Sequence, residues 1–577
     1  MRIGGIASGM DTEQLISDIM RAERVRLDRY NQDGQRIKWR QEAFHNINRD
    51  MANFILKSRK DLGLNKVASS GALVKSSSSS FDWVKKATSV NEGVVKATAK
   101  ADAMSGTHTV KVKQLASVAS LTSKDISGLM DADGNFLAGS YGPLTITTDA
   151  GSKTFTIGAA AGEIQTIDQL VSEINNATDS SGGTAVSLGI RAAYDKTLGK
   201  LMINTRTTGE QKNITMSNTL AGTFFDSLNA QGTDAILWFN ESPDATQWSN
   251  ASSIDPVTFD SSKAIKQSTN NFTLYGINLQ LNNVQQQTDN AVSINVDTNV
   301  EGMVDKITAF VKDYNEMIGK VNSLTKEKIY RDYRPLSSEE KEAMKETDIE
   351  LWEEKAKSGL LRNDESITRT LQNIRSGLYE NVYTGGTATD RGTLIGVQNH
   401  LTHIGIATGS YQSGGKLEID ETKLREAISN NPEGVVDLLF ATSDIAVPEL
   451  SDNPTTAEIA ARNLAVANKR ANTGLFNRVY DDMINGMKDI VSRSGTGNDS
   501  DLYRDVQSTM LIDFVTSGGI SKLDKDLLSL NERIINEERL LASREDRYWK
   551  QFTAMEKAME KMNQQSGWLM AQLGQSG

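Results

Sequence analysis

The side chains that could hold a metal ion or perform catalysis are few in this sequence, and none occurs in a complete arrangement. The chain has no cysteine and four histidines, which excludes disulfides, thiolate metal sites and cysteine nucleophiles. His400 and His403 are three positions apart and could offer two imidazoles to one ion, but no third ligand is identifiable. A pair of surface histidines is the simpler interpretation.

Two short motifs look like ligand-binding loops but depart from the pattern at a required position. Residues 131–135 (DADGN) begin like a calcium-binding loop, yet the glycine comes two positions early and Phe136 occupies the required glycine place. Residues 495–500 (GTGNDS) contain two glycines, but no Gly-Lys-Ser sequence follows to hold a phosphate. We therefore expect a hairpin turn at the first motif and no phosphate loop at the second. The sequence predicts a protein that is not an enzyme and carries no cofactor or metal ion.

Length, charge and hydropathy exclude several classes of partner. With 577 residues, the chain is long enough for three to five domains of about 150 residues each. The net charge is −11, and the arginines between Arg21 and Arg29 are interleaved with Glu23 and Asp28, so no concentrated basic face offers a nucleic-acid site. No apolar run approaches the roughly 18 to 20 residues of a membrane span, which predicts that the chain does not insert in a membrane.

The first ten residues give no sign of a secretory signal peptide, because they lack the apolar run of about 7 to 15 residues that such a peptide contains. A cysteine-free chain without a signal peptide is typical of the cytoplasm. It fits equally well a protein that leaves the cell unfolded by another route. Composition does not distinguish these two locations.

Proline and charge divide the chain into three parts. All seven prolines lie between Pro143 and Pro454, so both ends can form long helices. Charged side chains are about half as frequent at residues 101–300 as elsewhere, and β-branched residues alternate with other residues there in runs such as 107–112 (THTVKV). Such alternation is typical of half-buried strands. The sequence therefore predicts helices, then strands, then helices.

The C-terminal region carries the clearest periodic signal. Its apolar residues are spaced by three, four or seven positions, which is a heptad pattern. Residues 521–577 also carry nine basic and nine acidic side chains, as the solvated exterior of a coiled coil does. The predicted contact residues of this helix are Leu523, Leu527, Leu530, Ile534, Leu541, Tyr548, Phe552, Met555, Met559, Met562 and Leu569.

The N-terminal region repeats this pattern and offers the C-terminal helix a partner. Asp11 or Thr12 can cap a helix whose first predicted contact residues are Leu15 and Ile19. A run with heptad spacing follows, and its predicted contact residues are Ile37, Phe44, Ile47, Met51 and Phe54. Because a single amphipathic helix cannot bury such a stripe alone, we expect the two ends of the chain to pair as a coiled coil. The alternative is one helix hairpin inside a globular core.

Five segments of the chain, taken in order, match motifs of one family. They are residues 5–16 (GIASGMDTEQLI), 106–116 (GTHTVKVKQLA), 310–318 (FVKDYNEMI), 404–409 with 415–420 (IGIATG and GKLEID) and 548–556 (YWKQFTAME). Together they resemble the bacterial flagellar filament cap proteins, also called the hook-associated protein 2 family. A weaker similarity, at 167–175 and 200–204, is to a strand–helix–strand insert common in flagellar axial proteins.

The resemblance implies an α+β multidomain fold. In it, the terminal helices pair as a coiled coil, and β-rich head domains are inserted in a helical leg domain. Residues 330–361 look like an elaboration seen in Gram-positive relatives. The implied domains are 1–66 (N-terminal coiled-coil helices and the first part of the leg), 67–300 (the head, with one subdomain inserted near 120–235), 301–445 (the returning leg), 446–520 (a helical segment) and 521–577 (the C-terminal coiled coil).

The resemblance also implies a function and a set of partners. Such caps are exported through the flagellar secretion channel without a cleaved signal peptide and form a ring, usually described as a pentamer, at the filament tip. There they promote flagellin polymerisation and prevent the loss of flagellin monomers. The implied partners are further copies of this chain, flagellin, the flagellar export apparatus and an export chaperone, and the implied location is extracellular.

Two other functions stay open at this point. The first is another flagellar axial subunit, either a junction protein or a flagellin. The cap-like opening and tail of the chain disfavour it, as does the absence of an Asn-rich opening. The second is an adhesin whose β-rich head binds glycans of a host or surface, a role that is compatible with capping.

Overall fold

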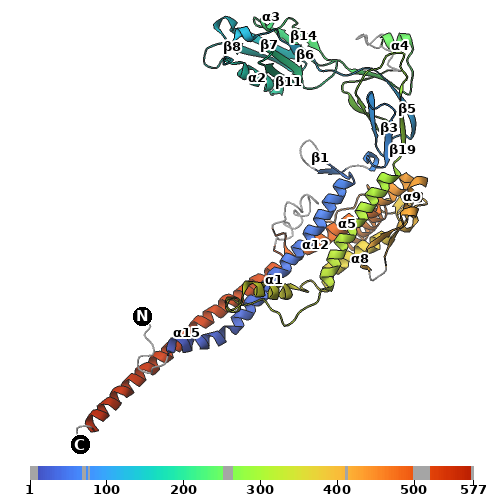
Figure 1. Cartoon of the computed structure of the whole chain (residues 1–577). Coiled ribbons are helices and arrows are strands. Elements are labelled where there is room, and N and C mark those ends of the chain that lie inside the picture. Colours follow the sequence, from blue (N-terminus) through green and yellow to red (C-terminus); the bar gives the residue numbers. More distant parts are fainter. Residues whose placement is uncertain are drawn as a thin grey trace. The chain divides into compact units, whose positions relative to one another are not determined.

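The computed structural model describes residues 11–67, 73–75, 78–250, 264–409, 413–497 and 520–573. It divides into two compact units (Figure 1). The helical unit comprises Met1–Ser78 and Val304–Gly577, and the β-rich unit comprises Ser79–Met303. The predicted α+β class, with helices at both ends and strands between them, is confirmed. Among the described helices, none combines the length and the apolar content that crossing a membrane requires.

Long helices frame the helical unit. They are α1 (Thr12–Asp61), α5 (Val300–Lys326), α8 (Glu365–Tyr379), α12 (Leu475–Ser494) and α15 (Lys522–Leu573). As the absence of proline predicts, α1 and α15 run without interruption, and α15 runs along the N-terminal part of α1 (Figure 1). Asp11 caps α1, because its carboxylate accepts a hydrogen bond from the backbone N–H of Gln14 at 2.9 Å.

Shorter elements complete the helical unit. The region expected to be an elaboration forms two small helices, and the late motif forms the antiparallel hairpin of β22 and β23. Of the segment 446–520, residues 498–519 lie outside the described residues. The shorter elements are β1 (Asn65–Val67), β2 (Leu73–Lys75), α6 (Ser338–Glu342), α7 (Glu346–Lys357), β20 (Tyr383–Thr384), β21 (Thr393–Leu394), η4 (Leu401–Ile404), β22 (Ile406–Thr408), β23 (Leu417–Ile419), α9 (Glu421–Asn430), α10 (Pro432–Phe440) and α11 (Thr456–Ala471).

Aromatic side chains from α1, α5 and α12 meet in the centre of the helical unit. The rings of Phe310 and Phe476 are stacked with centroids 3.8 Å apart, and Phe54 of α1 lies 5.5 Å from Phe310. Tyr480 lies 6.2 Å from Phe54. Because α1 is far in the sequence from α5 and α12, this cluster helps to join the N-terminal segment of the helical unit to its C-terminal segment.

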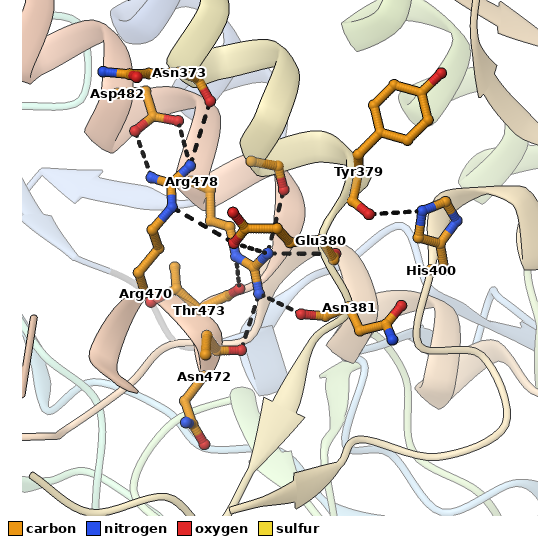
Figure 2. A network of polar contacts seen from close by, with 12 residues as sticks. Asn373, Tyr379, Glu380, Asn381, His400, Arg470, Asn472, Thr473, Arg478 and Asp482 are labelled. Carbon is orange, nitrogen blue, oxygen red and sulfur yellow. Dashed lines mark hydrogen bonds and ion pairs between the residues drawn. The ribbon is translucent and has the colours of Figure 1, made fainter. Parts of the chain in front are cut away.

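A buried arginine fastens the ends of two further helices to α12 (Figure 2). Arg478 is 1% exposed and donates hydrogen bonds of 2.8 to 3.4 Å to backbone carbonyls in the last turns of α8 and α11 and just after them. The carboxyl end of a helix leaves carbonyls without partners and attracts positive charge. The acceptors are the carbonyls of Gly377, Glu380, Asn381, Ala471 and Thr473.

The β-rich unit contains two packed sheets built from alternating sequences. In β4 the side chains of Val95, Ala97 and Ala99 point inward and those between them outward, as the alternation predicts. The larger sheet has the order β16 (Ile265–Gln267), β15 (Ala235–Phe239), β5 (Gly106–Gln114), β19 (Val292–Thr298) and β3 (Lys85–Ser89). The smaller sheet has the order β17 (Asn271–Leu274), β18 (Ile277–Leu281) and β4 (Val95–Ala99). The short elements η1 (Ser78–Ser80) and α4 (Ala245–Asn250) lie outside both sheets.

A second core lies in the segment between β5 and β15. Its buried apolar residues, from Ala119 to Phe225, form a cluster separate from that of the two packed sheets. The helix α2 (Ile167–Asn175) covers this core. One of its sheets has the order β14 (Asn229–Gln231), β13 (Asn213–Ser217), β7 (Gly142–Thr148) and β8 (Gly151–Ile157); another has the order β11 (Ile190–Asp195), β12 (Lys200–Thr205) and β6 (Ser120–Thr122). The remaining elements are η2 (Ser127–Leu129), η3 (Ala138–Ser140), the pair β9 (Thr178–Asp179) and β10 (Val186–Ser187), and α3 (Ala221–Phe224).

Candidate functional site

The first turns of α1 bury a different face from the predicted one. Ile16 and Met20 are buried, whereas Leu15 is 40% exposed and Ile19 is half-buried. Residues four positions apart lie on the same side of a helix. The contact stripe therefore passes through Ile16 and Met20, one position after each of the residues that the sequence indicated.

An apolar cluster joins this stripe to α15. Ile16 and Met20 are buried with Leu541, and further side chains of both helices pack around these three. The two helices are antiparallel, since the start of α1 contacts the later part of α15. The surrounding residues are Leu27, Tyr548, Trp549 and Phe552. Leu541, Tyr548 and Phe552 thus lie where the heptad pattern put them, while Leu27 and Trp549 were not predicted.

A buried carboxylate, paired with a largely exposed arginine, occupies one heptad position that contains no apolar residue. Between Ile534 and Leu541 the apolar spacing jumps by seven, and Glu537 stands at the skipped position. Glu537 is 5% exposed, and its carboxylate lies 3.7 Å from Nε of Arg26 on α1. A carboxylate buried at this depth needs such a partner, because an unpaired charge is costly away from water.

A second pair fills the next gap in the apolar spacing, between Leu541 and Tyr548. Arg544 donates to the carboxylate of Glu23 on α1, and the hydroxyl of Tyr548 donates to the same carboxylate at 3.2 Å. Both partners are partly exposed. The seven-residue jumps were the signal in the sequence that could have revealed both charged positions.

The other predicted residues of α15 differ in their surroundings along the helix. Leu523 and Leu530 are buried, and a Cβ added to Gly34 of α1 would lie 3.4 Å from Leu530 Cδ2, so the helices approach closely there. Leu527, Ile534, Met555 and Met559 are half-buried. Met562 is 66% exposed and Leu569 is 55% exposed, beyond the described part of α1.

The predicted contact residues in the second half of α1 have another partner than expected. Phe44, Ile47, Met51 and Phe54 are buried, as predicted, but this part of α1 contacts α5 and α12. Phe54 meets the aromatic rings of α5 and α12. The amide of Asn48 donates to the carbonyl of Met487 on α12 at 3.3 Å. Ile37 is half-buried and lines a cleft together with Leu523.

The turn at Asp131 and the side chain of His400, which were considered as ligand-binding motifs, form hydrogen bonds with nearby residues of the chain. Asp131 accepts hydrogen bonds from the backbone N–H groups of Asp133 and Asn135 and from the Asn135 amide, which lowers its pKa. Met130 and Phe136 pair as an antiparallel bridge, so the motif is a turn. One ring nitrogen of His400 lies 2.9 Å from the Tyr379 carbonyl, as Figure 2 shows. The described residues contain no group of three or more His, Asp or Glu side chains placed to bind a metal ion.

Two family models match this chain, one over each end. Residues 8–119 match the model described as the N-terminus of flagellar hook-associated protein 2, and residues 256–564 match the model of its C-terminus. The second match alone covers more than half of the chain. Between them they include both helices of the candidate site and exclude most of the segment that carries the second β core.

Individual proteins show the same similarity. The chain is 29% identical over 589 residues to a flagellar hook-associated protein 2 of Halalkalibacterium halodurans, covering 98% of both chains. It is 25% identical over 283 residues to one of Thermotoga maritima, covering 47% of this chain and 38% of that one. A crystal structure of the D1, D2 and D3 domains of the flagellar cap protein FliD from Escherichia coli matches 74% of this chain and 95% of its own, with 19% identity and a TM-score of 0.41.

Proposed function

The chain belongs to the flagellar hook-associated protein 2 family, and we propose on that ground that it caps the distal end of a growing bacterial flagellar filament. In this role it promotes the polymerisation of flagellin and prevents the loss of flagellin monomers. The role is structural, and no catalytic step is part of the proposal. The single observation that carries it is the match of both ends of the chain to the models of this family.

The pairing of α1 with α15 supports a mechanical role for the two ends of the chain. Two helices that are joined through a buried apolar cluster and ion pairs form a stiff element that can be held between neighbouring subunits. Beyond this pairing, α15 carries exposed apolar side chains, which in a soluble protein mark contact surfaces. We propose that these side chains contact neighbouring subunits or flagellin. They are Met562, Trp568, Leu569 and Met570.

Assembly and location follow from the same proposal. The chain forms a ring of identical subunits, a homopentamer, at the filament tip outside the cell. It reaches the tip through the flagellar export apparatus with the help of an export chaperone. The absence of cysteine supports this route, since a chain without disulfides needs no oxidative step after export.

The experiment that tests the proposal is a deletion of the gene in its own bacterium, complemented with the intact chain. We expect the deletion strain to release flagellin monomers into the medium and to make short filaments or none, and we expect the complemented strain to recover. Filaments of normal length in the deletion strain would contradict capping.

Electron microscopy of the purified chain distinguishes the alternative of another axial subunit. A cap closes on itself and gives annular particles, whereas an axial subunit polymerises into open helical filaments. An adhesive head that binds a glycan is compatible with either result. It would appear as a loss of surface attachment when Ser79–Met303 is replaced, with filaments unchanged.

A further inference from the structure

A cleft of about 650 Å³ lies in the helical unit, beside the paired helices α1 and α15. One wall is the middle of α1, and the start of α15 lies beside it. The opposite walls are the loops that precede α6 and follow α7, within the region expected to be an elaboration. The volume lies within the range of about 300 to 1,000 Å³ that is typical of ligand-binding pockets.

The cleft is basic although the chain is acidic. Five arginines line it together with two aspartates, Asp33 and Asp526, whereas the net charge of the chain is −11. The arginines come from α1 and from both loops, so no single helix carries all of them. They are Arg36, Arg40, Arg331, Arg334 and Arg362.

Two of these arginines already form side-chain hydrogen bonds within the chain, and the other three have no carboxylate partner among the described residues. Arg40 donates to the carboxylate of Asp364 at 3.0 Å, and Arg362 donates to the carbonyl of Glu327 at 3.1 Å. For the other three, no carboxylate within the described parts of the chain lies close enough for an ion pair. They are Arg36, Arg331 and Arg334, and all three are exposed. Their guanidinium groups can bind carboxylates with two hydrogen bonds each.

The loop walls are held in place by hydrogen bonds that leave these three side chains unused. The backbone N–H of Gly359 donates to the Glu327 carboxylate at 2.7 Å, and Trp352 Nε1 donates to the carbonyl of Arg334 at 2.7 Å. Gly359 has a φ of +70°, and a Cβ there would lie 2.6 Å from Ile329, so only glycine fits. A fixed wall lowers the entropy that a ligand must offset on binding.

Apolar side chains lie between the charged ones. Ile37, Leu360 and Leu523 line the cleft, and Ile329 lines it while 43% exposed. A compact anion such as phosphate would leave these side chains uncovered and would meet the two aspartates. A segment that alternates carboxylates with apolar side chains would cover both kinds of surface.

We propose that this cleft binds an acidic polypeptide segment of a partner protein, one that carries apolar side chains beside its carboxylates. The carboxylates pair with the three free guanidinium groups, and the apolar side chains lie on Ile37, Ile329 and Leu360. The proposal goes beyond capping, because it names a binding site for a further partner beside the paired terminal helices, which contribute Ile37 and Leu523 to its lining. It stands or falls separately from the proposed function.

A phage-displayed library of random short peptides, selected on the full-length chain, tests the proposal without knowledge of the partner. We expect enriched peptides that combine Asp or Glu with Leu, Ile or aromatic residues. Their synthetic versions should bind at least about tenfold more weakly to Arg331→Glu/Arg334→Glu. Binding should also weaken as salt shortens the screening length from about 10 Å at 0.1 M to about 3 Å at 1 M.

The matched control is Arg29→Glu, which reverses an exposed charge on α1 outside the cleft. It should leave binding unchanged, and circular dichroism should show both proteins folded. Three results would overturn the proposal: selection of no acidic peptide, equal binding to the double variant, or saturable displacement of the peptides by inorganic pyrophosphate alone, which would indicate a small-anion site. Loss of self-association in the double variant, without peptide binding, would instead make the cleft a contact between copies of this chain.

Discussion

Replacing Arg478 by methionine tests whether one buried side chain holds the ends of α8 and α11 against α12. Methionine keeps much of the length and apolar volume of arginine but has no donor. Every hydrogen bond from the guanidinium group to the backbone is then lost at once (Figure 2). Burial lowers the pKa of Arg478 to about 10, so the group is still protonated and donating at neutral pH.

The expected loss of stability follows from what is left behind. An unsatisfied buried polar group costs about 1 to 3 kcal/mol, but the nearby Glu380 side chain is 52% exposed, so water can reach some of the carbonyls. Removal of the buried charge also returns part of its desolvation cost. Removing one partner from a buried charged arrangement typically costs about 3 to 5 kcal/mol. We expect the free energy of unfolding of the helical unit to fall by about 3 to 5 kcal/mol, out of a total of about 5 to 15 kcal/mol.

Urea unfolding followed by far-ultraviolet circular dichroism measures the change, because the long helices belong to the helical unit. A control of similar chemistry is Arg462→Met, since Arg462 donates to a single carbonyl, that of Pro448, at 2.6 Å. It should cost no more than about 1 kcal/mol. Arg478→Lys should fall between the two, because an ammonium group keeps the charge but cannot match the planar set of donors.

Hydrogen exchange locates the effect. Amides at the carboxyl ends of α8 and α11 should exchange faster in Arg478→Met, while those of the β-rich unit keep their wild-type rates. The proposed role of Arg478 in holding these helix ends is refuted if Arg478→Met and Arg462→Met have the same unfolding midpoint and slope. It is also refuted if the faster exchange appears in the β-rich unit instead.

Three further predictions concern the terminal helices and the β-rich unit. Leu541→Asp should lower the stability of the helical unit by about 2 to 5 kcal/mol for the lost side chain and by more for the buried charge, so flagellin monomers should accumulate in the medium of that strain. The control is Glu538→Lys at an exposed position, which should keep the stability within about 0.5 kcal/mol of wild type and keep normal filaments. The fragment Ser79–Met303 should fold alone with a strand-dominated circular dichroism spectrum, and a helical or unfolded spectrum would disprove its independence. Hydrogen bonds from the N–H groups of Ser181 and Ser152 lower the pKa of Asp179 to about 2 from 3.8. The contribution of this carboxylate to stability is therefore present above pH 3.8 and is lost as the pH falls toward 2. The urea midpoint of Asp179→Asn should fall less over this pH range than that of the wild type.

Patterns that depend on neighbours in the sequence were predictable here. The heptad spacing indicated α15, the absence of proline indicated long terminal helices, and β-branched alternation indicated the β-rich unit. Which helix the apolar face of α1 would contact was not predictable in the same way. Phe44 and Phe54 are as apolar as Leu541, and nothing local distinguishes a helix that meets α15 from one that meets α5 and α12.

Burial of charge was the other feature that local reasoning missed. In the sequence, Arg478 is one of several charged residues of an amphipathic helix, yet in the structure it is nearly inaccessible to water. Its acceptors lie on segments about a hundred residues earlier and immediately before it, and only the folded chain brings their carbonyls together. The same is true of the basic cleft, since Arg36 and Arg331 belong to segments that are distant in the sequence.

The two ion pairs between α1 and α15 have a consequence for how these helices align. An apolar heptad seam alone permits the helices to slip by seven residues, because each slip presents a similar surface. Along α1 the order is Glu23 then Arg26, and along the antiparallel α15 the facing residues are Arg544 and Glu537. A slip by one heptad in one direction brings Glu537 opposite Glu23, and in the other direction it brings Arg544 opposite Arg26. Either slip places like charges opposite each other, and one slip brings Glu23 against the buried Glu537, so the charged positions select one alignment even if they add little to stability. Because α1 and α15 lie at opposite ends of the chain, no short loop fixes their alignment. The charged positions supply that alignment, which a further buried leucine would not.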